Sequence, residues 1–244
     1  ADVRGWKRPV WGRRKIRRKK NPETMEITYK EIRENKEINL LIEKGNQVMQ
    51  ALGYTEHSKK HAARVAETAG KILKELGYDQ KAIELSRIAG YMHDIGNSIN
   101  RHDHAHSGAA LAYQILKGMR MPLEDILVIV TAIGHHDEST GTAVDVVSAA
   151  LILADKTDVR RNRVQNPNIA SFDAHDRVNY AALSTSLEIK EEKKVIQVEL
   201  ELDDTMCTVM DYFEIFLQRM LMCKRAAEVL GCRFKLLANG SKLC

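Results

Sequence analysis

The sequence is poor in cysteine and has no long hydrophobic run. Its 244 residues include four cysteines, the first at Cys207, and no C-x-x-C pair. A disulfide framework or a thiolate zinc site is therefore not expected, and reduced thiols in a cytoplasmic protein are the better interpretation. Because no run of about 18 apolar residues occurs, we expect no membrane span. No apolar stretch follows the basic N-terminus, so we expect no secretory signal.

Positive charge is concentrated at the N-terminus. The formal net charge is +5, but residues 1–20 hold ten Lys and Arg against one Asp, which leaves the rest of the chain mildly acidic. The stretch from Arg4 to Pro22 has no helical or strand period, so we expect residues 1–24 to form a disordered arm. With Trp6 and Trp11 available for stacking, the arm could bind nucleic acid. The interpretation that we favour is a tail that takes no part in the fold, because runs of like charge are usually disordered tails.

The segment from Thr28 to Asp158 shows helical spacing of apolar residues. Short polar or Gly-containing links divide it, as in a helical bundle. The spacing predicts a bundle over residues 25–165, with six amphipathic helices at about 38–52, 57–76, 79–93, 107–118, 122–133 and 142–159.

The C-terminal third has a different pattern. Leu187 and Ile189, and then the positions from Ile196 to Leu202, alternate with polar residues on either side of a hairpin-like "KEEKK". A helix from about 205 to 230 and a strand in "CRFKLLA" follow. We therefore predict a mainly α protein with a small α+β (β-β-α-β) appendage over residues 185–244, joined through a connecting segment at 166–184. The alternating strand face permits a homodimer.

Metal-capable side chains are concentrated in the helical part. Eight of the nine histidines fall between His57 and His136, and imidazole combined with carboxylate suits Zn, Fe, Mn or Co. His93 and Asp94 end a predicted helix, where adjacent side chains point about 100° apart and can hold one ion or reach two. Asp155 ends a buried apolar run, where a carboxylate is costly unless it is paired or metal-bound.

These residues form an ordered set along the chain. With their contexts "HAARVA", "YMHDIGN", "IGHHDE" and "ILADKTD", they give the pattern H…HD…H…HH…D. This pattern resembles that of the HD-domain superfamily of metal-dependent phosphohydrolases, over about residues 55–163. The alternative is a buried polar network without metal. The candidate ligands are His61, His93, Asp94, His104, His135, His136 and Asp155.

The resemblance implies a helical bundle that holds one or two divalent transition ions. In two-metal relatives, the residues that match His61, His93, Asp94 and Asp155 hold one ion. Those that match Asp94, His104, His135 and His136 hold the other, so that Asp94 bridges. The presence of both His135 and His136 favours two ions, which together can activate a hydroxide. Asp94 and His93 are the expected catalytic residues.

The third ligand position has more than one candidate. Relatives tend to show His-x-x-x-Gly-x-x-Leu here, a spacing that His104, Gly108 and Leu111 satisfy and His106 does not. We therefore choose His104. His102 is interpreted as a loop residue. His57, four residues before His61, could line the pocket or cap its helix, and we favour the cap.

Phosphate esters need positive groups near the ions. Lys156 follows Asp155 directly, and Arg161 lies six residues after Asp155, as an Arg does in the HD-type hydrolases of diadenosine tetraphosphate that this stretch resembles. Asn97 is a third substrate-binding candidate, although many hydrolytic relatives have Lys there. The alternative is that "DKTDVRRNR" is a solvated helix end whose cations the helix dipole favours.

The leading interpretation is a metal-dependent hydrolase of a small phosphorylated substrate, either a nucleotide or another phosphate ester. "HHDESTGTAVD" contains no Gly-Tyr-Pro motif, which excludes the HD-GYP cyclic-dinucleotide phosphodiesterases. Two alternatives stay open: a mixed-valent di-iron oxygenase of the same superfamily, and a regulatory, nucleic-acid-binding module with an HD core.

Deletion of residues 1–24 tests the nucleic-acid interpretation. If the arm binds phosphate backbones, the truncated protein should lose nucleic-acid affinity together with its steep salt dependence, because that dependence comes from released counterions. Fluorescence anisotropy of a labelled oligonucleotide, at low and at physiological salt, measures both. Affinity that is unchanged by the deletion and insensitive to salt would remove the arm from the function.

Overall fold

The computed structural model describes residues 26–244 except residues 191 and 193. The predicted N-terminal arm lies outside the described residues. Within the described part, no helix combines the length and the apolar character that crossing a membrane requires.

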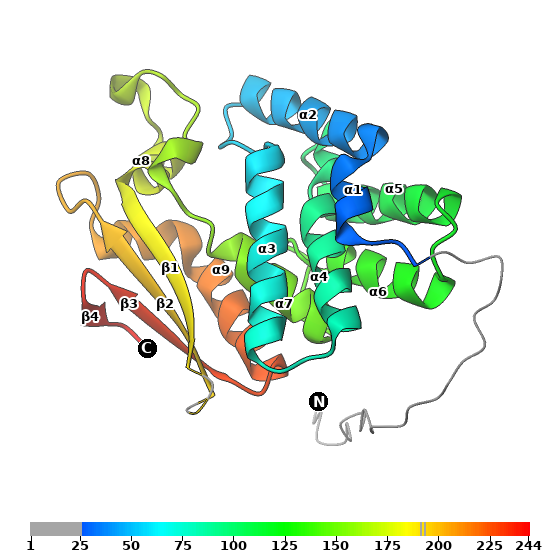
Figure 1. Ribbon diagram of the computed structural model, residues 1–244. Helices are drawn as coiled ribbons and strands as arrows, with labels where there is room; N and C mark the ends of the chain where they lie inside the picture. Colours follow the sequence, from blue (N-terminus) through cyan, green and yellow to red (C-terminus); the bar gives the residue numbers. More distant parts are fainter. Residues whose placement is uncertain (1–25, 191, 193) are drawn as a thin grey trace, which may run out of the picture.

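The N-terminal two thirds of the described chain form a helical bundle (Figure 1). Local signals set its helix ends: the Asp79 carboxylate accepts a hydrogen bond from the Ala82 amide at one helix start, and Gly53 and Gly77 take positive φ angles of 80° and 76° just after two helices end. The elements are α1 (Tyr29–Glu34), α2 (Lys36–Ala51), α3 (Lys59–Glu75), α4 (Gln80–Met92), the 3-10 turn η1 (Ile95–Ser98), α5 (His104–Gly118), α6 (Leu123–Gly134) and α7 (Val146–Lys156).

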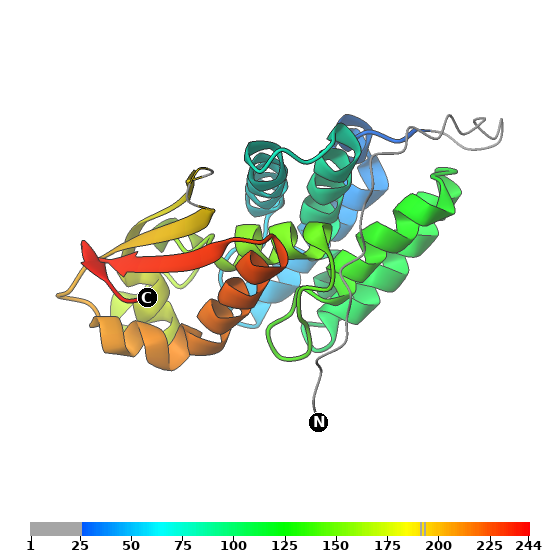
Figure 2. The ribbon, with the colours of Figure 1, turned by 90° about the horizontal axis from the view of Figure 1, so that it is seen from below.

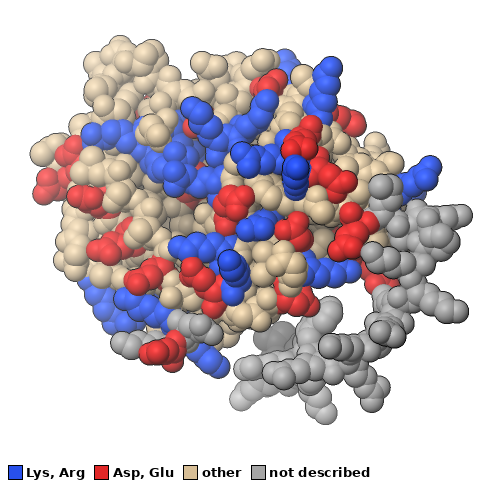
Figure 3. Space-filling model, in the orientation of Figure 1, with Lys and Arg blue, Asp and Glu red and all other residues tan. Residues whose placement is uncertain are grey.

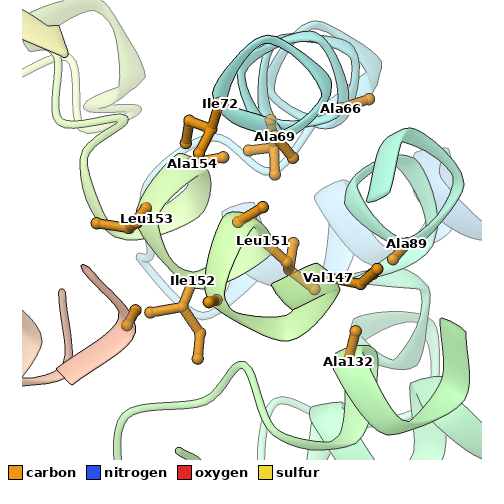
Figure 4. Close-up of a cluster of buried hydrophobic side chains, with 14 of the residues drawn as sticks. Ala66, Ala69, Ile72, Ala89, Ala132, Val147, Leu151, Ile152, Leu153 and Ala154 are labelled. Atoms are coloured by element: carbon orange, nitrogen blue, oxygen red, sulfur yellow. The ribbon is translucent and has the colours of Figure 1, made fainter. Parts of the chain in front are cut away.

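Helix α7 is the central element of the bundle. It is apolar on every side, and it packs against α3, α4, α6 and the later helix α9 (Val209–Val229). Figure 4 shows Val147, Leu151, Ile152, Leu153 and Ala154 of α7 among Ala66, Ala69 and Ile72 of α3, Ala89 of α4 and Ala132 of α6. The helix is shorter than the predicted 142–159, because Asp145 caps its start and it ends at Lys156. Asp155 therefore lies in the last turn of a buried helix.

The C-terminal third contains a small mixed sheet with the strand order β1-β2-β3-β4. Strand β2 pairs antiparallel with β1, for example Val198 with Leu187, and parallel with β3, for example Ile196 with Phe234. The parallel pair requires a crossover, which α9 supplies. The elements are η2 (Arg161–Arg163), η3 (Ile169–Ser171), α8 (Ala174–Ala181), β1 (Ala182–Lys190), β2 (Val195–Leu202), α9, β3 (Arg233–Ala238) and β4 (Ser241–Lys242).

The predicted mainly α fold with a small C-terminal α+β part is confirmed. The sequence pattern did not indicate β4, which is only two residues long, or the separation of α1 from α2. Helix α8 and the start of β1 lie in the segment that was expected to connect the two parts.

The two parts share one hydrophobic core. Helix α9 lies between the sheet and α7 (Figure 2), and its buried Tyr212, Phe216 and Cys223 belong to the same cluster as the bundle residues. The core is therefore continuous across the boundary expected near residue 165, and the C-terminal part is held close to the ends of the bundle helices.

The face seen in Figure 1 carries charges of both signs. Figure 3 shows Lys and Arg side chains interspersed with Asp and Glu side chains over this face. A mixed surface of this kind does not by itself select a strongly charged partner.

Gly90 allows α3 and α4 to pack closely, and its substitution should destabilise the fold. A Cβ at Gly90 would lie 2.8 Å from the Ala66 Cα and 2.9 Å from the Ala66 amide nitrogen, both backbone atoms. We expect Gly90→Ala to lower the free energy of unfolding by about 1–3 kcal/mol through overpacking, as measured by urea denaturation. Gly118→Ala is the matched control, because a Cβ there meets nothing within 4 Å, so its effect should stay within about 1 kcal/mol. Equal stability of the two variants would contradict this account.

Candidate metal centre

Five helix ends or first turns converge on one buried point. His61 lies in the first turn of α3, Asp155 in the last turn of α7, and His136 just after α6. His93 and Asp94 join α4 to η1, and His104 is the first residue of α5. The rings of His61, His93, His136 and His104 form a chain in which consecutive centroids are 5.2, 4.9 and 4.9 Å apart. The fold thus gathers side chains that lie up to 94 positions apart in the sequence.

The two oxygens of Asp94 face different groups. Its Oδ2 lies 3.0 Å from His93 Nε2 and 3.7 Å from His61 Nε2. Its Oδ1 lies 3.6 Å from His104 Nε2 and 3.8 Å from His136 Nε2. On the Oδ2 side, Asp155 Oδ1 adds contacts of 3.4 Å to His61 Nε2 and 3.6 Å to His93 Nε2. Asp94 therefore stands between two sets of nitrogen donors.

The outer nitrogen of each ring is already bonded. His61 Nδ1 lies 2.8 Å from Asp158 Oδ2 and His93 Nδ1 lies 2.8 Å from the Gly90 carbonyl oxygen. The same arrangement joins the Nδ1 atoms of His104 and His136 to the carbonyl oxygens of Arg101 and Ile133, at 3.1 and 2.6 Å. A ring that donates its Nδ1 proton outward presents a lone pair at Nε2, and outer-shell bonds of this kind orient metal-binding histidines.

The inward atoms have too few proton donors among themselves. His104 Nε2 and His136 Nε2 face each other at 3.1 Å, although both carry lone pairs when their Nδ1 atoms donate. His61 Nε2 and His93 Nε2 are buried and have no hydrogen-bond partner among the described residues. Buried acceptors that face one another are costly unless a proton or a cation lies between them.

The spacing of these donors fits a metal ion. With metal–ligand distances of about 2.1 Å, neighbouring ligands lie about 3.0 Å apart in an octahedral site and about 3.4 Å apart in a tetrahedral one. The inward contacts span 3.0–3.8 Å. Two groups, His61–His93–Asp155 and His93–Asp94–His136, have all their donor atoms within 4.8 Å of one another and could hold an ion. The residues present thus fit a divalent metal with nitrogen and oxygen ligands.

The ionisation of these groups also favours cation binding. Burial alone would raise the pKa values of the Asp94 and Asp155 carboxyls, but nearby cationic groups, His93 for Asp94 and Lys156 for Asp155, hold both well below their usual range. Burial and the neighbouring His136 lower the pKa of His104 to about 3. Burial would also lower the pKa of His93, but Asp94 and Asp155 raise it to about 10. A metal that binds His93 must therefore displace a proton.

Close backbone contact brings His104 to Asp94. A Cβ on Gly96 would lie 2.0 Å from the His104 carbonyl oxygen and 2.6 Å from the Gly108 nitrogen. Only glycine lets η1 and the first turn of α5 approach this closely. This contact gives a physical reason for the His-x-x-x-Gly spacing by which His104 was chosen over His106. The side chain of His106 is 59% exposed and that of His102 is 85% exposed.

His135 is the one candidate ligand that the structure does not bring into the cluster. Among the described residues it makes no ion pair or ring contact with the others, and its Nδ1 is buried without a hydrogen-bond partner. His135 caps the C-terminus of α6, whereas the next residue turns inward. Adjacent side chains at a helix end point in different directions, so two consecutive histidines need not share one ion.

The three predicted substrate-binding residues have different surroundings. Lys156 Nζ lies 2.8 Å from Asp155 Oδ2 and lines the cavity. Asn97 is buried, and its amide donates to Asp94 Oδ1 at 2.9 Å. Arg161 lies beyond the end of α7, bonds to the Tyr180 carbonyl and to Asp203 Oδ2, and stacks on the Tyr180 ring. It therefore joins η2 to the C-terminal part and does not line the cavity.

A cavity of about 400 Å³ opens beside the histidine cluster. Several of its lining residues were not singled out by the sequence pattern. Glu138 follows α6, and Arg219 comes from α9, where it forms a two-bond ion pair with Glu138. His175 and Asp176, the second His-Asp pair of the chain, line the cavity from α8. Residue spacing could not reveal that α8 and α9 line this cavity. These helices reach it through packing of the shared hydrophobic core.

The interpretation of His57 as a helix cap is wrong. Ser58 caps α3, and its side chain accepts a hydrogen bond from the Lys60 amide. His57 Nδ1 lies 2.6 Å from the Thr55 carbonyl oxygen, and its Nε2 lies in the cavity, 3.9 Å from Asp94 Oδ2. Burial lowers its pKa well below the usual value, so the ring is neutral. The sequence feature that could have placed His57 at the cavity is its position four residues, about one helical turn, before His61.

Comparisons with known proteins identify the family of the helical part. The family model of the HD domain matches residues 59–167. The uncharacterized protein MJ1020 of Methanocaldococcus jannaschii is 30% identical over 201 residues, covering 73% of this chain and 77% of that protein. Ribonuclease Y of Thermus thermophilus is 29% identical over 168 residues, and that of Campylobacter concisus is 31% identical over 119 residues. These matches cover 64% and 49% of this chain but only 27% and 21% of the two ribonucleases.

The hydrogen bond between Asp158 and His61 should matter for metal affinity. Asp158 is buried and accepts from His61 Nδ1, so Asp158→Asn should weaken metal binding about 10- to 100-fold by making the ring a poorer ligand. Competition with a chelating dye measures the affinity, and circular dichroism shows that the variant is folded. Asp204→Asn, at an exposed position, is the control. Unchanged affinity in folded Asp158→Asn would contradict the role assigned to this hydrogen bond.

Proposed function

The chain belongs to the HD-domain family, and we propose that it hydrolyses a small phosphate ester, such as a nucleotide, with the help of one or two bound divalent metal ions. The observation that carries the proposal is the convergence of four Nε2 atoms on the two oxygens of Asp94. Such a set of nitrogen and carboxylate donors is typical of sites for Zn, Fe, Mn or Co.

The residues divide naturally into two ligand sets around Asp94. His61, His93, Asp94 Oδ2 and Asp155 would hold one ion, and Asp94 Oδ1, His104 and His136 would hold a second. An ion of this kind acts as a Lewis acid, which makes water a better nucleophile near neutral pH and offsets charge on phosphoryl oxygens.

Side chains around the centre fix the orientation of its ligands. Lys156 binds Asp155 Oδ2 at 2.8 Å and leaves Oδ1 facing His61 and His93. Asn97 holds Asp94 through Oδ1. The neutral His57 ring presents its Nε2 to the cavity and can accept a hydrogen bond from water or from a substrate hydroxyl group.

The cavity favours a small substrate. Its volume of about 400 Å³ lies in the range of small-molecule sites, and residues of α8 and α9 form part of its wall. Two of the relatives are ribonucleases by name, so an RNA phosphodiester belongs among the substrates to be tested. The proposed nucleic-acid contact through the arm and the proposed homodimer stay predictions.

Substitution of Asp94 should abolish turnover. We expect metal-loaded protein to hydrolyse members of a panel of nucleotides, aryl phosphomonoesters and phosphodiesters, and short RNA. Asp94→Ala should lower kcat by at least about a thousandfold, since it removes the carboxylate shared by both ligand sets. Release of phosphate or nucleotide, measured with Mn²⁺, Fe²⁺, Zn²⁺ and Co²⁺ after chelation, is the readout.

Two controls sharpen this test. Asp204→Ala removes an exposed carboxylate and should retain activity, and iron-loaded protein assayed with and without oxygen separates hydrolysis from oxygenase chemistry. Full activity of folded, metal-free Asp94→Ala would sink the proposed function.

A further inference from the structure

Four cationic side chains line the cavity, and three of them are neutralised by carboxylates. Lys156 Nζ lies 2.8 Å from Asp155 Oδ2 and 3.6 Å from Glu138 Oε2. Arg219 binds both oxygens of Glu138, at 3.1 and 3.2 Å. The fourth cation, Arg101, is different.

The third neutralised cation, Arg163, is committed to the protein framework. It lies 3.8 Å from Asp158 Oδ2, and it donates to the carbonyl oxygens of Glu56 and Asp158 at 2.7–3.0 Å. Three of its five N–H donors therefore bind the chain itself, one from each of its three nitrogens.

Arg101 forms no ion pair with any carboxylate in the described part of the chain. It lies between η1 and α5, and it is half-buried. Its Nη1 is 3.5 Å from Asn97 Oδ1 and 3.3 Å from His104 Nε2, and its Cζ is 5.6 Å from the centroid of the half-exposed Tyr54 ring. Both polar contacts are long for hydrogen bonds to a guanidinium. A cation in a cavity with only weak neutral partners has donors free for an anion.

We propose that Arg101 binds a phosphoryl oxygen of the substrate. This inference rests on the proposed hydrolysis of a phosphate ester. The planar guanidinium presents several N–H donors that match phosphate geometry, and Arg101, His104 and Asp94 line the same cavity. The bound phosphoryl group would thus lie between the Arg101 side chain and the candidate metal ligands.

The proposal also accounts for Asn97. The Asn97 side chain lies in the same region but is uncharged, and its amide is engaged by Asp94. Arg101 lies four residues later and contacts the Asn97 side chain, so it supplies the positive charge that Asn97 lacks.

The contact with His104 is compatible with this assignment. The lone pair at His104 Nε2 can accept from Arg101 or bind a metal, but it cannot do both. Metal binding would release the guanidinium from His104 and leave its donors for the substrate. Arg101 therefore should not contribute to metal affinity.

Three proteins test the proposal: wild type, Arg101→Lys and Arg101→Gln. Metal content is measured for each, together with KM and kcat for the best substrate of the panel and the affinity for inorganic phosphate by calorimetry. We expect equal metal content, and phosphate affinity and 1/KM that fall about tenfold or more in Arg101→Gln. Arg101→Lys should give intermediate phosphate affinity and KM, because lysine keeps the charge but lacks the planar set of guanidinium N–H donors. Arg225→Gln removes an exposed arginine of α9 and should match wild type.

The outcomes separate this inference from the proposed function. If wild type is active but Arg101→Gln has unchanged KM and phosphate affinity, the inference is wrong and the function stands. If Arg101→Gln loses metal, the role of Arg101 is to orient the candidate ligand His104, and the inference is wrong as well. If metal-loaded wild type neither hydrolyses a phosphate ester nor binds phosphate, the proposed function itself fails.

Discussion

The centre of this structure depends on an electrostatic constraint: its buried acceptors face one another. His104 Nε2 and His136 Nε2 are 3.1 Å apart, and Asp94 and Asp155 direct oxygens at His61 and His93. Because the outer nitrogens donate to fixed carbonyl and carboxylate oxygens, the rings cannot turn to relieve the conflict without losing those bonds. A proton on His93 relieves part of it, and a divalent cation would relieve more. The cluster is therefore arranged to bind a cation, and burying its acceptors without one is unfavourable in free energy.

The apolar core holds this arrangement in place. Helix α7 is buried among its neighbours and carries Asp155 in its last turn, so a closely packed helix positions this candidate ligand. Gly90 lets α3 and α4 approach closely, while Gly96 lets η1 approach α5. The ligands thus lie on helix ends whose relative positions are set by backbone contacts, a geometry that keeps donors in place while a metal enters or leaves.

The sequence predicted those features that depend on local spacing. Helical periodicity indicated the bundle, and alternation indicated the sheet, because each pattern reflects one buried face. The order H…HD…H…HH…D indicated which histidines to consider, and the Gly108 spacing separated His104 from His106. Spacing could not tell where α7 ends, and so the position of Arg161 relative to Asp155 was not predictable. Nor could it tell that His136 turns inward and His135 does not, since that depends on the backbone angles after α6.

The features that were not predictable arise from contacts between distant segments. Glu138 binds Arg219 of α9 and also lies 3.6 Å from Lys156, which in turn binds Asp155. This chain of charges links the C-terminal helix to the candidate metal centre. Without α9, Glu138 would lose its two-bond partner beside buried Lys156, and the apolar side of α7 that packs against α9 would be open to water. Both changes are unfavourable. The C-terminal part is thus better understood as a wall of the site than as a module attached to a finished bundle, and the residues that distinguish one phosphate ester from another should be sought on α8 and α9 as well as among the histidines.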